Sequence, residues 1–144
     1  MRLERRLRYL CLLLLVSACG AQQSVRDALD PIAWRQFGDA TWRFDGVLLS
    51  VGPSTESGYL VSREAYGALR LSVEFFVEDD TNSGVFVNCS EPQEIADLNP
   101  DDCYEVNIWD NHPVQDFRTG AIVKRVPPAA HVNTIGRWNQ MVVE

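Results

Sequence analysis

Apolar and polar residues alternate along much of this sequence, which is typical of strands with one buried face. The clearest example is residues 68–78, where nearly every second residue is apolar. One face carries Leu69, Leu71, Val73, Phe75 and Val77, and the other carries Arg70, Ser72, Glu74, Phe76 and Glu78. A period of two residues predicts a half-buried antiparallel strand.

A second clear strand is predicted at residues 104–110, with Tyr104, Val106 and Ile108 on one face. The polar turn at 79–84 and the apolar run at 85–88 predict a hairpin-like return after the long strand. Shorter strands are expected at 42–44, 47–50, 58–61, 120–123 and 138–143. Many short strands joined by polar turns predict an all-β fold, an antiparallel β-sandwich or jelly roll.

The last predicted strand reaches the final residue of the sequence. Residues 137–144 carry no turn or polar tail after the strand pattern. A sandwich that ended there would leave an apolar edge unpaired, which proteins normally avoid. We therefore expect the sandwich to be incomplete at its C-terminus, with its closing strands missing.

The first 18 residues are predicted to be an export leader. An Arg-rich start precedes the apolar run 9–16, which is too short to span a bilayer as a mature helix. Residues 16–19 read VSAC and resemble the bacterial lipobox, in which the cysteine is acylated and becomes the first mature residue. We expect a lipid anchor at Cys19, and the lack of Asp at Gly20 favours the outer membrane, facing the periplasm. A generic signal peptide is the alternative.

After the leader we expect a tether at residues 19–33 and one sandwich domain at 34–144. The whole chain has a formal charge of −7 with 46% hydrophobic residues, which excludes a disordered protein. Without residues 1–18 it keeps 9 basic and 19 acidic residues, a charge of −10. Nucleic-acid binding requires a Lys- and Arg-rich face, so this balance argues against it.

Two cysteines remain in the predicted domain, Cys89 and Cys103. In an oxidising compartment such a pair is more often a disulfide than a reactive site. Closing this loop of about 15 residues would contribute about 3 kcal/mol in the chain-entropy model. No Cys and His cluster is present, so neither a metal nor another cofactor is predicted.

The polar face of the 104–110 strand is the strongest candidate site. Glu105, Asn107 and Trp109 alternate along it, so their side chains share a face. The carboxylate can transfer protons, the amide can orient a hydroxyl, and the indole can stack on a sugar ring. A solvated outer face is the alternative. A retaining glycosidase needs two carboxylates about 5–5.5 Å apart, and this face offers one.

Three further residues are weaker candidates. Glu74 would meet Glu105 if their strands were neighbours, although such a residue is more often solvated. His112 follows the Glu105 strand closely and is the best-placed histidine for proton transfer, although a surface histidine is the more common case. Asn82 either belongs to a simple turn or bonds a ligand at the rim of the sheet.

Six motifs in order resemble the 3-keto-disaccharide hydrolase family, over about residues 34–144. They are GYLVS at 58–62, YGxLRLSVEF at 66–75, NSGVFV at 82–87, YEVNIWD at 104–110, TGAI at 119–122 and RWNQ at 137–140. The resemblance implies a concanavalin-like jelly roll in a secreted or lipid-anchored protein. The chain departs from the family at Asn107, usually Gln, at Asn88, often Arg, and in the insert 90–102.

The resemblance also implies a chemistry that one carboxylate can perform. Oxidation of C3 of a glucoside to a ketone makes the C2 proton acidic, so a base can remove it and the C1 substituent can leave before water adds. Glu105 would be the base or the acid, His112 its partner, and Trp109 a stacking platform. Asn107 and Asn82 would donate to hydroxyls or an oxyanion. The alternative is a non-catalytic carbohydrate-binding module.

Overall fold

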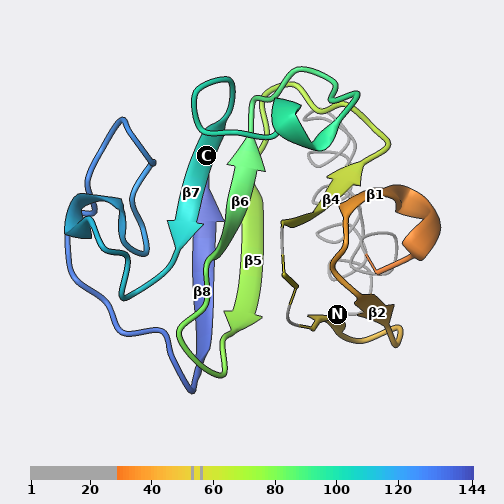
Figure 1. Cartoon of the computed structure of the whole chain (residues 1–144). Helices are drawn as coiled ribbons and strands as arrows, with labels where there is room; N and C mark the ends of the chain where they lie inside the picture. Colours follow the sequence, from red (N-terminus) through yellow and green to blue (C-terminus); the bar gives the residue numbers. More distant parts are fainter. Residues whose placement is uncertain (1–28, 53, 56) are drawn as a thin grey trace, which may run out of the picture. The chain divides into compact units, whose positions relative to one another are not determined.

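The computed structural model describes residues 29–52, 54–55 and 57–144 (Figure 1). The predicted leader, the anchor at Cys19 and most of the predicted tether lie outside these residues. The chain divides into two compact units, Met1–Leu69 and Arg70–Glu144. Among the described residues, no helix has the length and apolar character needed to cross a membrane.

The first unit contains two antiparallel strand pairs. A 3-10 turn, η1 (Pro31–Ala33), starts where Asp30 accepts a hydrogen bond from the Ile32 amide at 2.9 Å. Strand β1 (Trp34–Gly38), which the alternation pattern did not reveal, then pairs with β4 (Gly58–Ser62). Strand β2 (Trp42–Phe44) pairs with β3 (Leu49–Val51).

The second unit holds two more antiparallel pairs, but not in the expected combination. Strand β5 (Leu71–Phe76) pairs with β8 (Trp138–Val143), and β6 (Ser83–Val87) pairs with β7 (Tyr104–Ile108). The predicted hairpin between β5 and β6 is therefore wrong. The half-buried row of β5 instead meets the half-buried row of β8, with Leu71 opposite Val143 and Val73 opposite Met141.

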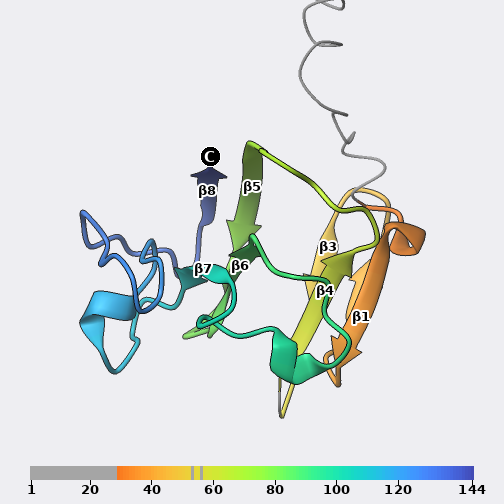
Figure 2. The same ribbon diagram turned by 90° about the horizontal axis from the view of Figure 1, so that it is seen from above.

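The two pairs of the second unit form separate layers. Figure 1 shows the β6–β7 pair in front of the β5–β8 pair, and Figure 2 shows the same strands from above. Within the described residues every strand pair is antiparallel and no α-helix is present, so the predicted all-β fold is confirmed. The arrangement is consistent with a β-sandwich of the jelly-roll type.

Strand β7 has backbone partners on both edges. On one side it pairs with β6, and on the other it bonds to residues 119–123: the amide of Asn107 donates to Ala121 at 3.0 Å and the amide of Val123 donates to Glu105 at 3.0 Å. The expected strand at 120–123 is reduced to isolated bridges. The chain turns back between Ile122 and Val126, which bond each other at 2.9 Å, so the ladder cannot continue.

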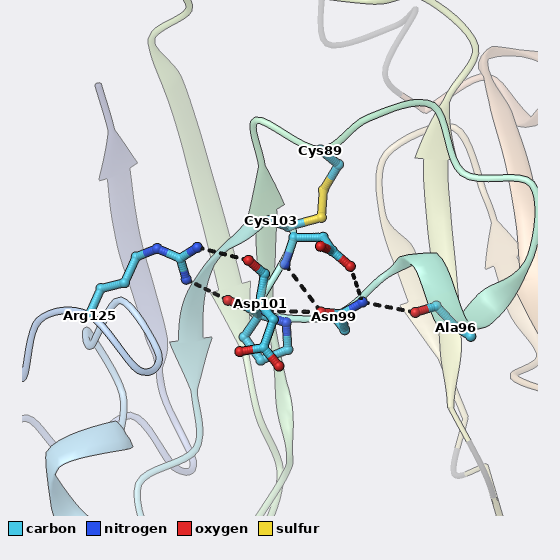
Figure 3. Close-up of a disulfide and its surroundings, with 8 residues drawn as sticks. Cys89, Ala96, Asn99, Asp101, Cys103 and Arg125 are labelled. Atoms are coloured by element: carbon cyan, nitrogen blue, oxygen red, sulfur yellow. Dashed lines mark hydrogen bonds between the residues drawn. A yellow bond between two sulfur atoms is a disulfide. The ribbon is translucent and has the colours of Figure 1, made fainter.

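A disulfide closes the β6–β7 pair at one end. Cys89 follows β6 and Cys103 precedes β7, and the two are bonded as predicted (Figure 3). The loop between them contains the 3-10 turn η2 (Ile95–Asp97). Cys103 is 1% exposed, and the buried Leu98, Ile108, Ala121 and Val123 lie in the same part of the chain. The core of this unit is therefore centred on β7 and its flanking segments.

Asp110 fastens the loops that follow β7. Strand β7 ends at Ile108, two residues earlier than predicted, because the Trp109 carbonyl accepts from the amides of His112 and Thr119 and the chain turns there. The buried Asp110 carboxylate accepts from Thr119 Oγ1 at 2.6 Å, and from Thr134 N at 2.6 Å and Oγ1 at 3.0 Å. Burial opposes its ionisation, but these hydrogen bonds and the charge of Arg118 outweigh burial and lower the pKa of Asp110.

The substitution Asp110→Asn should destabilise the fold. The amide keeps the size of the carboxylate, but its NH2 group would face a buried donor and leave that donor without a partner. We expect the free energy of unfolding to fall by about 1–3 kcal/mol. Chemical denaturation at neutral pH measures the change. Asp116→Asn alters an exposed aspartate in η3 (Gln115–Phe117) and is the matched control, with little expected effect.

The loss of stability caused by Asp110→Asn should disappear at low pH. Because the folded-state pKa of Asp110 is lowered, its charge stabilises the fold above the ordinary Asp value of about 3.9. That stabilisation disappears as the pH falls through the folded-state pKa. The difference between wild type and Asp110→Asn should therefore narrow at low pH, and a constant difference would contradict the assignment.

Candidate functional site

A hollow of about 340 Å³ lies beside β7 in the second unit. This volume is at the lower end of the range for ligand pockets. Its lining includes five of the six side chains proposed from the sequence as catalytic or sugar-binding, namely Asn82, Glu105, Asn107, Trp109 and His112. The other lining residues are Pro100, Val114, Phe117, Val123 and Lys124, which the sequence did not single out.

The alternation of side chains along β7 and a glycine in β6 leave room for the Glu105 side chain. Glu105 and Asn107 are two residues apart and therefore share a face of the strand. Gly84 pairs with Asn107 across the ladder. A Cβ atom at Gly84 would lie 3.4 Å from Glu105 Oε1 and 3.0 Å from the Val106 carbonyl oxygen. Gly84 was missed by the sequence reasoning, although a glycine within a strand often marks such a close approach.

Glu105 is a half-buried carboxyl without a charged partner. Among the described residues, its carboxylate makes no hydrogen bond or ion pair. Burial disfavours the charged form, so the pKa of Glu105 is raised above its usual value. A carboxyl whose pKa is moved toward neutrality is suited to general acid or base chemistry, because both protonation states are then accessible.

The Asn107 side chain has one polar atom bonded and one free. The side chain is 2% exposed, and its Nδ2 donates to the Phe117 carbonyl. Its Oδ1 is buried and has no hydrogen-bond partner in the described structure. A buried acceptor without a partner costs about 1–3 kcal/mol, so this oxygen is suited to accept a hydrogen bond from a hydroxyl.

Three rings gather at the Trp109 end of the hollow. The ring of His112 lies 4.6 Å from Trp109 and 5.6 Å from Phe117, in edge-to-face geometry. His112 Nδ1 is 2.9 Å from the Val114 amide nitrogen and 2.8 Å from the Val114 carbonyl oxygen. Nδ1 can therefore accept from the amide when it is unprotonated and donate to the carbonyl when it is protonated. The ring position is held in either state.

Glu74 and the two cysteines of the domain do not line the hollow. Glu74 lies in the exposed row of β5, opposite Gln140 of β8, and does not line the hollow. It is not a strand neighbour of Glu105, which pairs with Phe86. Cys89 and Cys103 form the disulfide. No group of three or more His, Cys, Asp or Glu side chains in the described part of the chain is arranged to hold a metal ion.

Comparison with known proteins agrees with the motifs. The family model of the 3-keto-alpha-glucoside-1,2-lyase-like domain matches residues 23–144. Neither the curated proteins nor the solved structures gave a match. The family is named for an activity on a carbohydrate, which supports a carbohydrate-related function. Because the match covers most of the sequence, this chain belongs to the family of 3-keto-alpha-glucoside-1,2-lyase-like domains.

Proposed function

We propose that this protein cleaves 3-keto-glucosides, with Glu105 as the group that removes the C2 proton. The observation that carries the proposal is a half-buried carboxyl with a raised pKa and no charged partner, set in a hollow beside an unsatisfied amide oxygen and an aromatic cluster. A hydrolase that forms a glycosyl-enzyme intermediate needs a second carboxylate, and none lines this hollow. Elimination needs only one.

The proposed reaction has three steps: proton removal, elimination and hydration. The ketone at C3 acidifies the C2 proton, and transfer of that proton to Glu105 leaves the electron pair in an enolate with its charge on the C3 oxygen. The C1–O bond then breaks, a C1=C2 double bond forms, and the departing oxygen takes up a proton. Water adds across the double bond, with its hydroxyl at C1 and a proton at C2. The base, the proton donor and a group at the oxyanion supply the catalysis.

Five of the lining residues have a role that follows from their side-chain chemistry. The aromatic cluster of Trp109, His112 and Phe117 offers apolar surface for the sugar ring. Asn107 Oδ1 accepts from a ring hydroxyl. When His112 Nδ1 accepts from the Val114 amide, the proton is on Nε2, which can donate to the developing oxyanion. Asn82, exposed immediately before β6, provides a second donor.

The alternative is a lectin-like module without catalysis, which a hollow with one carboxylate and an aromatic cluster also favours. Unmodified and 3-keto disaccharides separate the two functions. Binding of both sugars without product would favour the module. Selective conversion of the 3-keto sugar would favour the enzyme.

The substitution Glu105→Gln should lower kcat/KM for a 3-keto-glucoside by at least about 100-fold, the usual minimum contribution of a general base. Stability should be unchanged or higher, because a neutral amide avoids the burial cost of the charge. Product formation and a denaturation curve measure the two effects. Glu74→Gln, on the exposed row of β5, is the matched control. Near-normal turnover by Glu105→Gln would reject the assignment.

The pH profile provides a separate test of the same group. As the base, Glu105 must be ionised, and burial raises its pKa. Activity should therefore rise with pH through a midpoint above the ordinary Glu value of about 4.3. The profile of kcat/KM for wild type measures this midpoint in the free enzyme. A midpoint at or below the ordinary value would contradict a buried base.

Attachment to a membrane through Cys19 is the proposed localisation, supported by the VSAC motif at residues 16–19. Acyl chains hold a protein at a membrane surface at about 0.8 kcal/mol per buried methylene. In a bacterial host, Cys19→Ser should abolish incorporation of labelled palmitate and release the protein from the membrane fraction. Cys11→Ser, within the predicted leader, is the control and should retain the label. Labelling that persists without Cys19 would exclude this anchor.

A further inference from the structure

We propose that the disulfide-closed loop 89–103 and Lys124 form the part of the site that contacts the leaving group of the substrate. The inference rests on the proposed function and adds the residues that determine which glycosides fit. Pro100 of the loop and Lys124 both line the hollow together with Glu105. We call these two residues the loop wall.

Asn99 holds Pro100 at a defined position. Its Oδ1 accepts from the amides of Asp101 at 2.9 Å and Asp102 at 3.2 Å. Its Nδ2 donates to the Ala96 carbonyl at 2.9 Å, and its own carbonyl accepts from the Cys103 amide at 3.0 Å (Figure 3). The turn that carries Pro100 is thus hydrogen-bonded to the backbone of Cys103, one of the two disulfide cysteines.

Two neighbouring cations attach this loop to the segment on the other edge of β7. Lys124 Nζ lies 2.9 and 2.7 Å from the two carboxylate oxygens of Asp101. The Arg125 guanidinium donates to the carbonyls of Pro100 and Asp101 (Figure 3). It also lies 4.5 Å from the Tyr104 ring centroid. The loop wall is therefore tied together across the end of β7.

The Lys124–Asp101 ion pair is expected to position the two side chains and to add little to the stability of the fold. The Lys124 and Asp101 side chains are 49% and 69% exposed, and ion pairs this exposed contribute only about 0–1 kcal/mol. Lys124 also has a φ of 61°, a left-handed conformation that is uncommon for residues other than glycine. This conformation belongs to the tight turn between Ile122 and Val126, which places the Lys124 side chain beside Asp101.

The order of atoms in the reaction assigns the loop wall to the leaving group. Glu105 acts at C2, which lies between the C3 ketone and the C1 substituent. Trp109 lies beyond the C-terminal end of β7, four residues from Glu105, whereas Val123, bonded to the Glu105 backbone, immediately precedes Lys124. A sugar ring placed toward the aromatic cluster directs its C1 substituent past Glu105 toward the loop wall.

The chemistry of the loop wall favours a hydroxylated leaving group without charge. The Lys124 ammonium has hydrogens to donate to hydroxyls, and Asp101 balances its charge. Pro100 adds an apolar surface. A second sugar, the leaving group that the family resemblance implies, would meet both groups, so the loop wall should favour it over a small alcohol.

Two substrates that differ only in the leaving group test the inference in the full-length protein. A 3-keto-disaccharide such as 3-keto-trehalose presents a sugar to the loop wall, and methyl 3-keto-α-glucoside presents a methoxy group. For Lys124→Met and for Asp101→Asn, the ratio of kcat/KM for the disaccharide to that for the methyl glucoside should fall about tenfold, mainly through KM. Arg137→Met, an exposed cation elsewhere in the unit, is the control and should leave the ratio unchanged.

The outcomes separate this inference from the proposed function. If wild type converts both substrates and both variants keep the wild-type ratio, the loop wall does not contact the leaving group and the inference is overturned. An equal loss on both substrates would also overturn it, because the residues would then act on folding or on the reacting centre. Conversion of neither substrate by wild type would reject the proposed function, and this inference with it.

Discussion

The backbone ladders on both edges of β7 are the constraint on which the site depends. The ladder with β6 brings Gly84 beside Glu105 and ends at the disulfide, which carries the Pro100 loop. The bonds to residues 119–123 bring Val123 and Lys124 to the same hollow. Asp110 then fixes the turn after β7, close to the aromatic cluster. Residues far apart in the sequence thus meet because one strand holds a partner on each edge.

The charges around the hollow leave its lining carboxylate without a cationic partner. Glu105 carries the only carboxylate among the lining residues, its pKa is raised by burial, and the lining cation Lys124 is paired with Asp101 rather than with Glu105. A carboxyl that remained paired with a cation would have a lowered pKa and would be a poorer base. The Lys124–Asp101 ion pair therefore has two effects: it joins the two segments, and it keeps Lys124 from pairing with Glu105.

Several features were predictable because they depend on local pattern. The alternation in 68–78 and 104–110 marked β5 and β7. In β5 one face is more buried than the other, whereas in β7 both faces are partly buried. The alternation also placed Glu105 and Asn107 on a common face. The pairing of β5 with β8 was not predictable, because the sequence also fits a return through the nearby 85–88 segment, and no local pattern indicates that Leu71 and Val73 lie opposite Val143 and Met141. The same choice removed Glu74 from the site.

The sequence by itself determined the all-β class, the family, the cysteine pair and the polar row of β7, because each is encoded in residue type and short spacing. Tertiary structure alone decided the depth of burial of Glu105, the lack of a partner for Asn107 Oδ1 and the position of Pro100 and Lys124 beside the hollow. The pKa of a carboxyl depends on the atoms around it. Which polar atom of an amide side chain lacks a hydrogen bond depends on the partner that binds the other polar atom. Both depend on contacts between segments, which no local pattern specifies.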